Sequence, residues 1–329
     1  MSSERPPLGI RVLSALGKEP DWLAMTAEEL AAFRDAENRK RASRLARVVT
    51  GCPDRGAEIQ WHEVQLPDRT VPVRVYRPTS GNPDDLPPLI LHVHGGGFVG
   101  TAVQSDWVNS HLAAQLPAVV VSVEHRLLAP GTALPAAAAD GWDVLLHILD
   151  NPKTWGIDPT RTAVFGESTG GLIAALAALR ARDTNVPLRA QVLVNPALDV
   201  TPTGLDYPSV TEHGASPTLT LGVMQLLHQL AAPPGVDPIP LSPLRTDDLS
   251  GLAPALVVVP TVDPIADHGR RYAERLSAAG TPTRLVEHFG ATHAFLSMPG
   301  VVPHAKVARA QISDFLREHL LAHAPDPLG

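Results

Sequence analysis

The stretch of sequence that decides the fold is Arg161-Thr162-Ala163-Val164-Phe165-Gly166-Glu167-Ser168-Thr169-Gly170-Gly171, and an alanine-rich run follows it at residues 172–182. The short apolar run predicts a buried strand, and the alanine-rich run predicts a helix. Between them, glycines flank Ser168 in a G-x-S-x-G pattern, which lets the backbone make a sharp, strained turn. The sequence therefore predicts a strand, a turn and a helix, with the Ser168 hydroxyl at the tip of the turn above a sheet.

Strands and helices alternate along most of the remaining chain. Two alternating stretches, 59–64 and 71–76, predict an antiparallel pair. Short runs that are apolar throughout predict buried strands at 89–93, 118–123, 162–165, 190–194 and 255–259. Helical stretches lie at 106–115, 136–150, 172–182, 267–279 and 304–321. This order predicts an α/β fold with a mostly parallel central sheet and helices on both faces.

Two segments fall outside this alternation. Thr26 and Glu29 form a capping-box pattern that begins a helix expected over residues 27–48. Residues 201–250 are rich in Pro, Thr and Gly, contain one helical stretch at 219–230, and are too long for a plain connection in a compact domain. We interpret them as a lid insertion that packs against the N-terminal helices, the alternative being a plain surface loop. The expected division is a cap segment 1–50, a core 51–200, a cap insertion 201–250 and a second core part 251–329.

Composition excludes several classes of protein. The 329 residues are 44% apolar, which excludes a disordered chain, and the net charge of −7 argues against a nucleic-acid partner. Cys52 is the only cysteine, so neither an intrachain disulfide nor a cysteine-based metal site is expected. There is no run of 18 apolar residues and no apolar leader, which predicts a cytoplasmic protein without stable membrane insertion. A basic cluster, Arg39 to Arg47, has acids beside it and is interpreted as a solvated helix face, the alternative being an anion-binding or membrane-binding patch.

A serine hydroxyl needs a base to remove its proton and an acid to orient that base. On turns of this kind the partners follow along the chain as acid and then histidine. Asp263 lies in the turn after the apolar strand ending at Val259, whereas its rival Asp267 falls in the first turn of the next helix. His293 follows the next strand, 283–289, in a loop; its competitor His288 lies within that strand, where a structural role is expected. The hypothesis is a Ser168, His293 and Asp263 triad.

The developing oxyanion of acyl transfer also needs hydrogen-bond donors. His94-Gly95-Gly96-Gly97-Phe98 follows the strand at 89–93, and its glycines let backbone N–H groups converge on one point. The backbone N–H of Thr169 would be a further donor. By itself the glycine run could also be a tight turn or a phosphate-binding nest. The G-x-S-x-G turn at Ser168, the nucleophile elbow, favours an oxyanion loop.

Taken together, these motifs resemble the bacterial hormone-sensitive-lipase-like carboxylesterases of the α/β-hydrolase superfamily, over nearly all of the chain. The further pieces are His125-Arg126-Leu127-Leu128-Ala129-Pro130, Asp263-Pro264-Ile265-Ala266-Asp267-His268-Gly269 and His293-Ala294-Phe295. The resemblance implies an α/β-hydrolase fold with a helical cap and cofactor-free cleavage of carboxylic esters, usually with short to medium acyl chains. It places the nucleophile at Ser168, the acid at Asp263, the base at His293 and the oxyanion donors at Gly96, Gly97 and Thr169.

The chain departs from the family pattern near the site. Glu167 and Thr169 replace the usual aspartate and alanine of the elbow, His125 replaces a tyrosine, and His268 replaces a glutamate. These departures bear on substrate choice, and Glu167 is a candidate substrate contact. Phe98 is a second candidate, as a wall beside the oxyanion loop. Met224 of the lid stretch is a third, although an apolar stripe there fits packing equally well.

Two alternatives to an esterase stay open. One is a catalytically silent ligand receptor, because the plant gibberellin receptors resemble this family but lack the triad histidine; here His293 is present. The other is an amide, lactone or carbamate hydrolase, which the same triad could serve. The expected partner is a small ester, with neither metal nor cofactor, and the resemblance implies a homodimer through the final strand and helix as an alternative to a monomer.

Overall fold

A single eight-stranded sheet runs through the structure, a computed structural model that describes residues 6–15, 19–81 and 85–321. The strand order is β1-β2-β4-β3-β5-β6-β9-β10. Strands β1 and β2 are antiparallel to each other, and β2 is antiparallel to β4. The strands β4, β3, β5, β6, β9 and β10 are all parallel. The prediction of a mostly parallel sheet with an antiparallel start is confirmed.

The strands have the bounds β1 Ala57–Gln65, β2 Thr70–Pro78, β3 Pro88–Val93, β4 Val119–Val123, β5 Asp158–Glu167, β6 Ala190–Val194, β9 Ala255–Val262 and β10 Thr283–Thr292. The interior strands β3, β4, β6 and β9 are buried along their whole length, as their continuous apolar sequences predict. Strand β10 extends beyond the expected end at residue 289. Its pairing with β9 is interrupted by an irregularity after His288 and resumes at Thr292.

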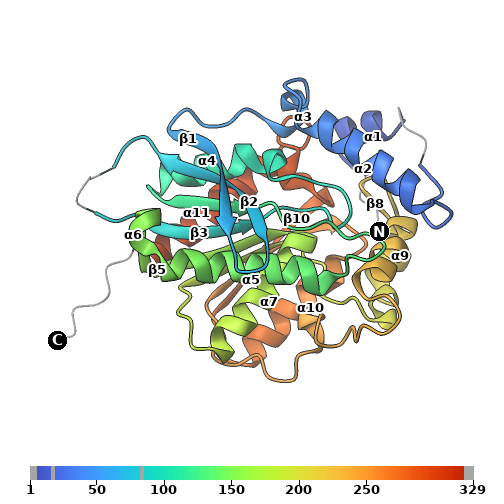
Figure 1. Cartoon of the computed structure of the whole chain (residues 1–329). Coiled ribbons are helices and arrows are strands. Elements are labelled where there is room, and N and C mark those ends of the chain that lie inside the picture. The colour runs from blue at the N-terminus through green and yellow to red at the C-terminus, as the bar shows by residue number, and fades with distance from the viewer. Residues whose placement is uncertain (1–5, 16–18, 82–84, 322–329) are drawn as a thin grey trace.

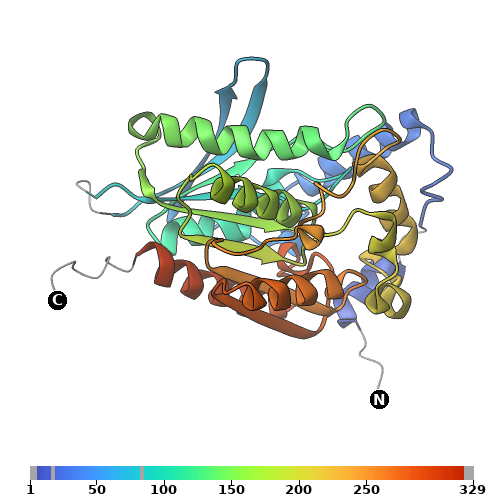
Figure 2. The ribbon, with the colours of Figure 1, turned by 90° about the horizontal axis from the view of Figure 1, so that it is seen from below.

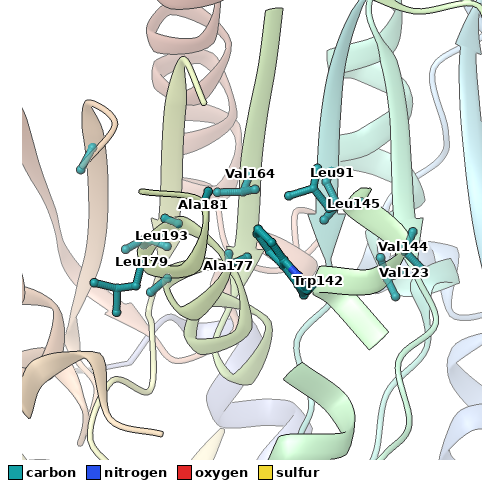
Figure 3. Close-up of a cluster of buried hydrophobic side chains, with 14 of the residues drawn as sticks. Leu91, Val123, Trp142, Val144, Leu145, Val164, Ala177, Leu179, Ala181 and Leu193 are labelled. Atoms are coloured by element: carbon teal, nitrogen blue, oxygen red, sulfur yellow. The ribbon is translucent and has the colours of Figure 1, made fainter. Parts of the chain in front are cut away.

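Helices cover both faces of the sheet (Figure 1). On one face lie α4 (Asp106–Gln115) and α11 (His304–Leu320), and on the other lie α5 (Leu134–Asp150), α7 (Thr169–Asp183) and α10 (Ala266–Ala278). In the core between the sheet and α5 and α7, Trp142 lies among Leu91, Val164 and Ala177 (Figure 3). Burying such aromatic and branched side chains provides most of the stability of the sheet–helix layers.

Most of the remaining helices, together with the two short strands β7 and β8, lie at the end of the sheet where the parallel strands have their carboxyl ends. They are α1 (Leu8–Ala15), α2 (Ala27–Arg41), α3 (Arg47–Thr50), α8 (Pro208–His213), β7 (Ala215–Ser216), β8 (Leu219–Thr220) and α9 (Leu221–Ala231). The short α6 (Pro152–Trp155) precedes β5 elsewhere. Figures 1 and 2 show α2 beside α9. Their apolar side chains share one buried cluster, which includes Leu30 of α2 and Leu226 and Leu230 of α9.

Helix α2 is shorter than predicted. The capping box at Thr26 and Glu29 is present, but the expected helix over 27–48 ends at Arg41 and resumes only as the four-residue α3. At the break the backbone changes to bonds with the third residue back: Ser43 N–H donates to Lys40 O at 3.1 Å, and Ala46 N–H donates to the carbonyl and the hydroxyl of Ser43, both at 3.2 Å. Likewise, the lid helix begins at Leu221 and not at residue 219, since Leu219 and Thr220 pair with β7.

Within the described ranges, no helix combines the length and the apolarity that a membrane crossing requires.

Candidate active site

Ser168 lies at the turn between β5 and α7, where the sequence predicts it. Its φ is +56° and ψ −119°, a strained conformation for a residue with a side chain, and its N–H donates to Val194 O at 2.9 Å. A Cβ at Gly166 would collide with the Gly170 carbonyl, and one at Gly170 would collide with the Val93 carbonyl. The flanking glycines therefore let helix α7 start directly against β3 and β5 while Ser168 turns outward.

Three side chains from three different strand ends meet at this turn. Ser168 Oγ lies 2.8 Å from His293 Nε2, and His293 Nδ1 lies 2.8 Å from Asp263 Oδ2. Asp263 follows β9 and is fully buried, and its Oδ1 accepts the Ile265 N–H at 3.0 Å. Since Asp263 accepts a hydrogen bond from Nδ1–H, Nε2 carries no proton and is left as the acceptor for the Ser168 hydroxyl. Parallel strands 5, 9 and 10 end at the same edge of the sheet, which is why residues so distant in sequence converge here.

The two rival residues lie elsewhere. Asp267, in the first turn of α10, accepts the Ser209 N–H and pairs with Arg270 at 3.1 Å. His288 lies inside β10 with its ring 5.1 Å from that of Phe295, and burial lowers its pKa. Neither residue contacts the Ser168 hydroxyl through any hydrogen bond of the described chain.

The glycine loop after β3 passes over the serine. Gly96 has φ +106°, and a Cβ there would collide with the Val99 carbonyl, while a Cβ at Gly97 would collide with Leu227 of α9. Only glycine therefore fits at Gly96, whereas a side chain at Gly97 would require Leu227 to move. Thr169 is the first residue of α7, whose opening N–H groups have no acceptor within the helix. The backbone N–H groups of Gly96, Gly97 and Thr169 are the donors that the sequence predicts for the oxyanion.

Two cavities meet at Ser168. The first, of about 30 Å³, is mainly apolar and is lined by Leu128, Leu172, Val200, Met224 and Leu227 among others. Thr169, His228 and His268 also line it. The second, of about 120 Å³, is lined by His293, the glycine loop and Phe98. Its polar lining also includes Arg41, Gln104, Glu167 and Ser297. Met224 thus lines the first cavity, and Phe98 and Glu167 line the second.

Glu167 is buried beside the serine. Its carboxylate accepts hydrogen bonds from the Ser297 hydroxyl at 2.8 and 3.1 Å. Burial raises the pKa of Glu167, and the bonds from Ser297 and the nearby His293 counteract the rise. The contact ties the elbow to the loop that carries His293, because Ser297 lies in η4 (Phe295–Ser297) directly after that histidine.

Several buried histidines surround the site in neutral form. His94 and His125 stack with ring centroids 4.4 Å apart, and burial lowers the pKa of each to about 4. His94 Nδ1 also contacts the Gly95 carbonyl at 3.0 Å, which braces the glycine loop. His228 of α9, on the wall of the smaller cavity, has its pKa lowered by burial to about 4. Among the described side chains, no group of three or more His, Cys, Asp and Glu is arranged to hold a metal ion.

Among the polar residues of the cavities that the sequence did not predict are Arg41, Gln104, Ser297 and His228. For Arg41 a signal was present, because it lies about three helical turns after the buried Leu30 and so on the same face of α2. Arg39, Lys40, Arg44 and Arg47 are exposed, as the interpretation of the cluster as a solvated face predicts, but Arg41 turns inward. No sequence pattern indicated Gln104, Ser297 or His228.

The fold and the contacts at Ser168 define a class of protein, and comparison with known families agrees. Residues 90–297 match the family described as having the alpha/beta hydrolase fold. The chain belongs to the α/β-hydrolase family.

Within it, several of the similar proteins are named esterases. The chain is 37% identical over 263 residues to the carboxylesterase NlhH of Mycobacterium tuberculosis, covering 75% of this chain and 80% of the relative. It is 32% identical over 256 residues to an ethyl acetate hydrolase of Pseudomonas putida, covering 76% and 79%. An ester hydrolase from the metagenome of Lake Arreo, solved with a bipyridine phosphonate derivative, superposes with a TM-score of 0.85 at 28% identity and covers 96% of this chain and 100% of that one. The resemblance to hormone-sensitive-lipase-like carboxylesterases is confirmed.

Proposed function

We propose that this carboxylic ester hydrolase works through a Ser168, His293 and Asp263 triad and an acyl-enzyme intermediate. The observation that carries the proposal is the unbroken chain of two 2.8 Å contacts from the Ser168 hydroxyl through His293 to the buried Asp263. The strained turn that presents the hydroxyl and the esterase relatives support it further.

In the first half of the reaction, Ser168 Oγ attacks the ester carbonyl while His293 Nε2 takes its proton. Asp263 orients the ring and stabilises the imidazolium. The carbonyl oxygen becomes an oxyanion, which accepts hydrogen bonds from the backbone N–H groups of Gly96, Gly97 and Thr169. His293 then gives its proton to the departing alcohol, and the acyl group stays on Ser168. In the second half, water attacks the acyl-enzyme with the same proton transfers, and the carboxylic acid leaves.

The two cavities take the two halves of the ester. The alcohol oxygen must lie near His293 to receive its proton, so the alcohol part occupies the 120 Å³ cavity that His293 lines. The acyl group then extends into the apolar cavity. Ser168 lines this cavity as well, but His293 does not. Its open volume of about 30 Å³ supports short acyl groups, with Met224 and Leu227 at its wall.

We also propose that residues 1–50 and 201–250 form a cap over a core made of 51–200 and 251–329. The shared apolar cluster of α2 and α9 and the bond from Thr220 to Glu19 support this division. A homodimer and a cytoplasmic location stay predictions.

Replacing Ser168 with Ala tests the mechanism. It should lower turnover of p-nitrophenyl butyrate by about 10⁶-fold, because no other group can form the acyl-enzyme. The circular dichroism spectrum and the thermal midpoint check that the fold survives. An organophosphonate should label the wild-type protein at Ser168 and leave the variant unlabelled. Turnover by the variant near the wild-type rate, or a wild-type protein that neither labels nor turns over, would refute the proposal. A series of p-nitrophenyl esters of increasing acyl length and a matched amide measure the acyl and ester preferences.

A further inference from the structure

Helix α2 contributes a cation to the larger cavity. Arg41 is the last residue of this helix, and its side chain lines the cavity together with the glycine loop, Glu167 and His293. One turn earlier, Asn38 Oδ1 accepts the Gly100 N–H at 2.9 Å. The end of α2 is therefore fixed directly onto the loop beside Ser168.

The position of the Arg41 guanidinium is set by Gln104. Arg41 Nη1 donates to Gln104 Oε1 at 3.1 Å, and Gln104 Nε2 donates to the Gly95 carbonyl at 2.9 Å. Because Gln104 is itself buried and bonded to the loop, its amide presents the carbonyl side to the arginine. The guanidinium has five N–H donors, and this contact uses only one nitrogen.

No carboxylate neutralises this cation at contact distance. Glu37 and Glu167 attract the Arg41 guanidinium electrostatically, but within the described chain neither forms an ion pair with it, and burial lowers its pKa. Glu37 pairs instead with Lys40 at 3.4 Å, and the Glu167 carboxylate accepts from Ser297. A partly desolvated guanidinium without a paired anion is unfavourable, and an anion brought by a ligand would correct it.

We propose that Arg41 binds a carboxylate carried by the alcohol part of the substrate, so that the enzyme prefers esters of hydroxycarboxylic acids. The inference rests on the proposed function, since only that function places the alcohol part in the cavity of Arg41 and His293. The planar guanidinium matches a carboxylate in a paired, two-bond geometry. The reaction is ordinary hydrolysis: ester and water give the acyl acid and the free hydroxycarboxylate.

Acetate esters of ω-hydroxycarboxylates test this proposal, each paired with the ester of the corresponding hydroxy-carboxamide, which has the same shape and no charge. The acetate released is measured for a series of increasing chain length. At one or more lengths, the wild-type kcat/KM for the carboxylate should exceed that for the amide by about tenfold or more, because a charged hydrogen bond is gained. Arg41→Gln should remove most of this ratio, mainly through KM, and Arg41→Lys should restore part of it. Arg39→Gln, on the exposed face of the same helix, is the matched control and should keep the wild-type ratio.

Each outcome decides the inference. If the wild type hydrolyses the amides as well as the carboxylates at every length, the inference is wrong while the proposed function stands. If Arg41→Gln slows both members of a pair alike, Arg41 only anchors α2, and the inference is again wrong. If the wild type hydrolyses neither series and an organophosphonate does not label Ser168, the proposed function itself fails. A ratio that falls in Arg41→Gln and persists in Arg39→Gln supports the inference.

Discussion

Glu167 shows how a single residue can depart from a family pattern and keep its surroundings intact. The longer side chain occupies a buried position next to the nucleophile, and both of its oxygens accept from Ser297. Its ionised form is nevertheless disfavoured by burial, so its pKa is raised in the folded protein. The folded state therefore binds more protons at this residue than the unfolded chain does, over the pH range just above the ordinary pKa of Glu.

This difference predicts a pH-dependent effect of Glu167→Gln. As the pH rises through that range, the folded wild-type protein must give up this extra proton and ionise a buried carboxyl, so its stability falls. The glutamine variant has no such proton, so its free energy of unfolding relative to wild type should increase as the pH rises above the ordinary pKa of Glu. Urea unfolding at several pH values measures it, with the exposed Glu58→Gln as the control. A difference that is constant with pH would contradict the assignment.

At the scale of elements, the contact between β3 and α7 is set by glycine. Gly170 lies in the first turn of α7, and its α-carbon faces the carbonyls of Val93 and His94 at the end of β3. A methyl group there can be accommodated only if the helix moves away from the strand. Such a shift would also displace Ser168, which precedes the helix.

Gly170→Ala should consequently cost about 3 kcal/mol or more of unfolding free energy, at the upper end of the range for overpacking, and should lower kcat. Gly81→Ala is the control, because the nearest heavy atom to its new Cβ lies 4.0 Å away. Chemical unfolding and ester turnover measure both variants. Equal stability of Gly170→Ala and wild type would show that the backbones are less closely opposed than described.

For the whole molecule, neutral histidines in the core make it sensitive to acid. His94, His125 and His228 come from three parts of the chain, and each has a pKa of about 4 because burial disfavours its charged form. In the unfolded chain these histidines take up protons near pH 6.5. Between these values the unfolded state binds more protons, so stability falls as the pH is lowered and the loss is complete near pH 4.

We expect up to about 3 kcal/mol of lost stability for each of these histidines over this range. His125→Gln should show a shallower decline of the unfolding free energy with falling pH than wild type does. His62→Gln, an exposed position on β1, should follow the wild-type curve. Parallel curves for wild type and His125→Gln would mean that His125 titrates alike in the folded and unfolded states.

Local patterns in the sequence were sufficient for the elements and for the order of the motifs. Apolar runs marked the buried strands, the capping box at Thr26 marked the start of α2, and the G-x-S-x-G turn marked the strand–helix junction, because each depends on neighbours in the chain. The predicted end of α2 was wrong, since after Arg41 the backbone turns through bonds to the third residue back, a local change that apolar periodicity does not register. The fold class, which follows from the alternation of these elements, is confirmed by the structure and the family match.

The sequence by itself named Ser168, Asp263 and His293, whose catalytic roles stay predictions, because each follows a recognisable strand at a fixed point of the order. Only the tertiary structure decided that their side chains lie in contact, since three strand ends must close on one edge of the sheet. It alone also brought Arg41 from the N-terminal helix and Ser297 from the far end of the chain to the same cavity. Such contacts depend on how the cap is placed over the sheet, and that placement results from packing between segments that share no local pattern.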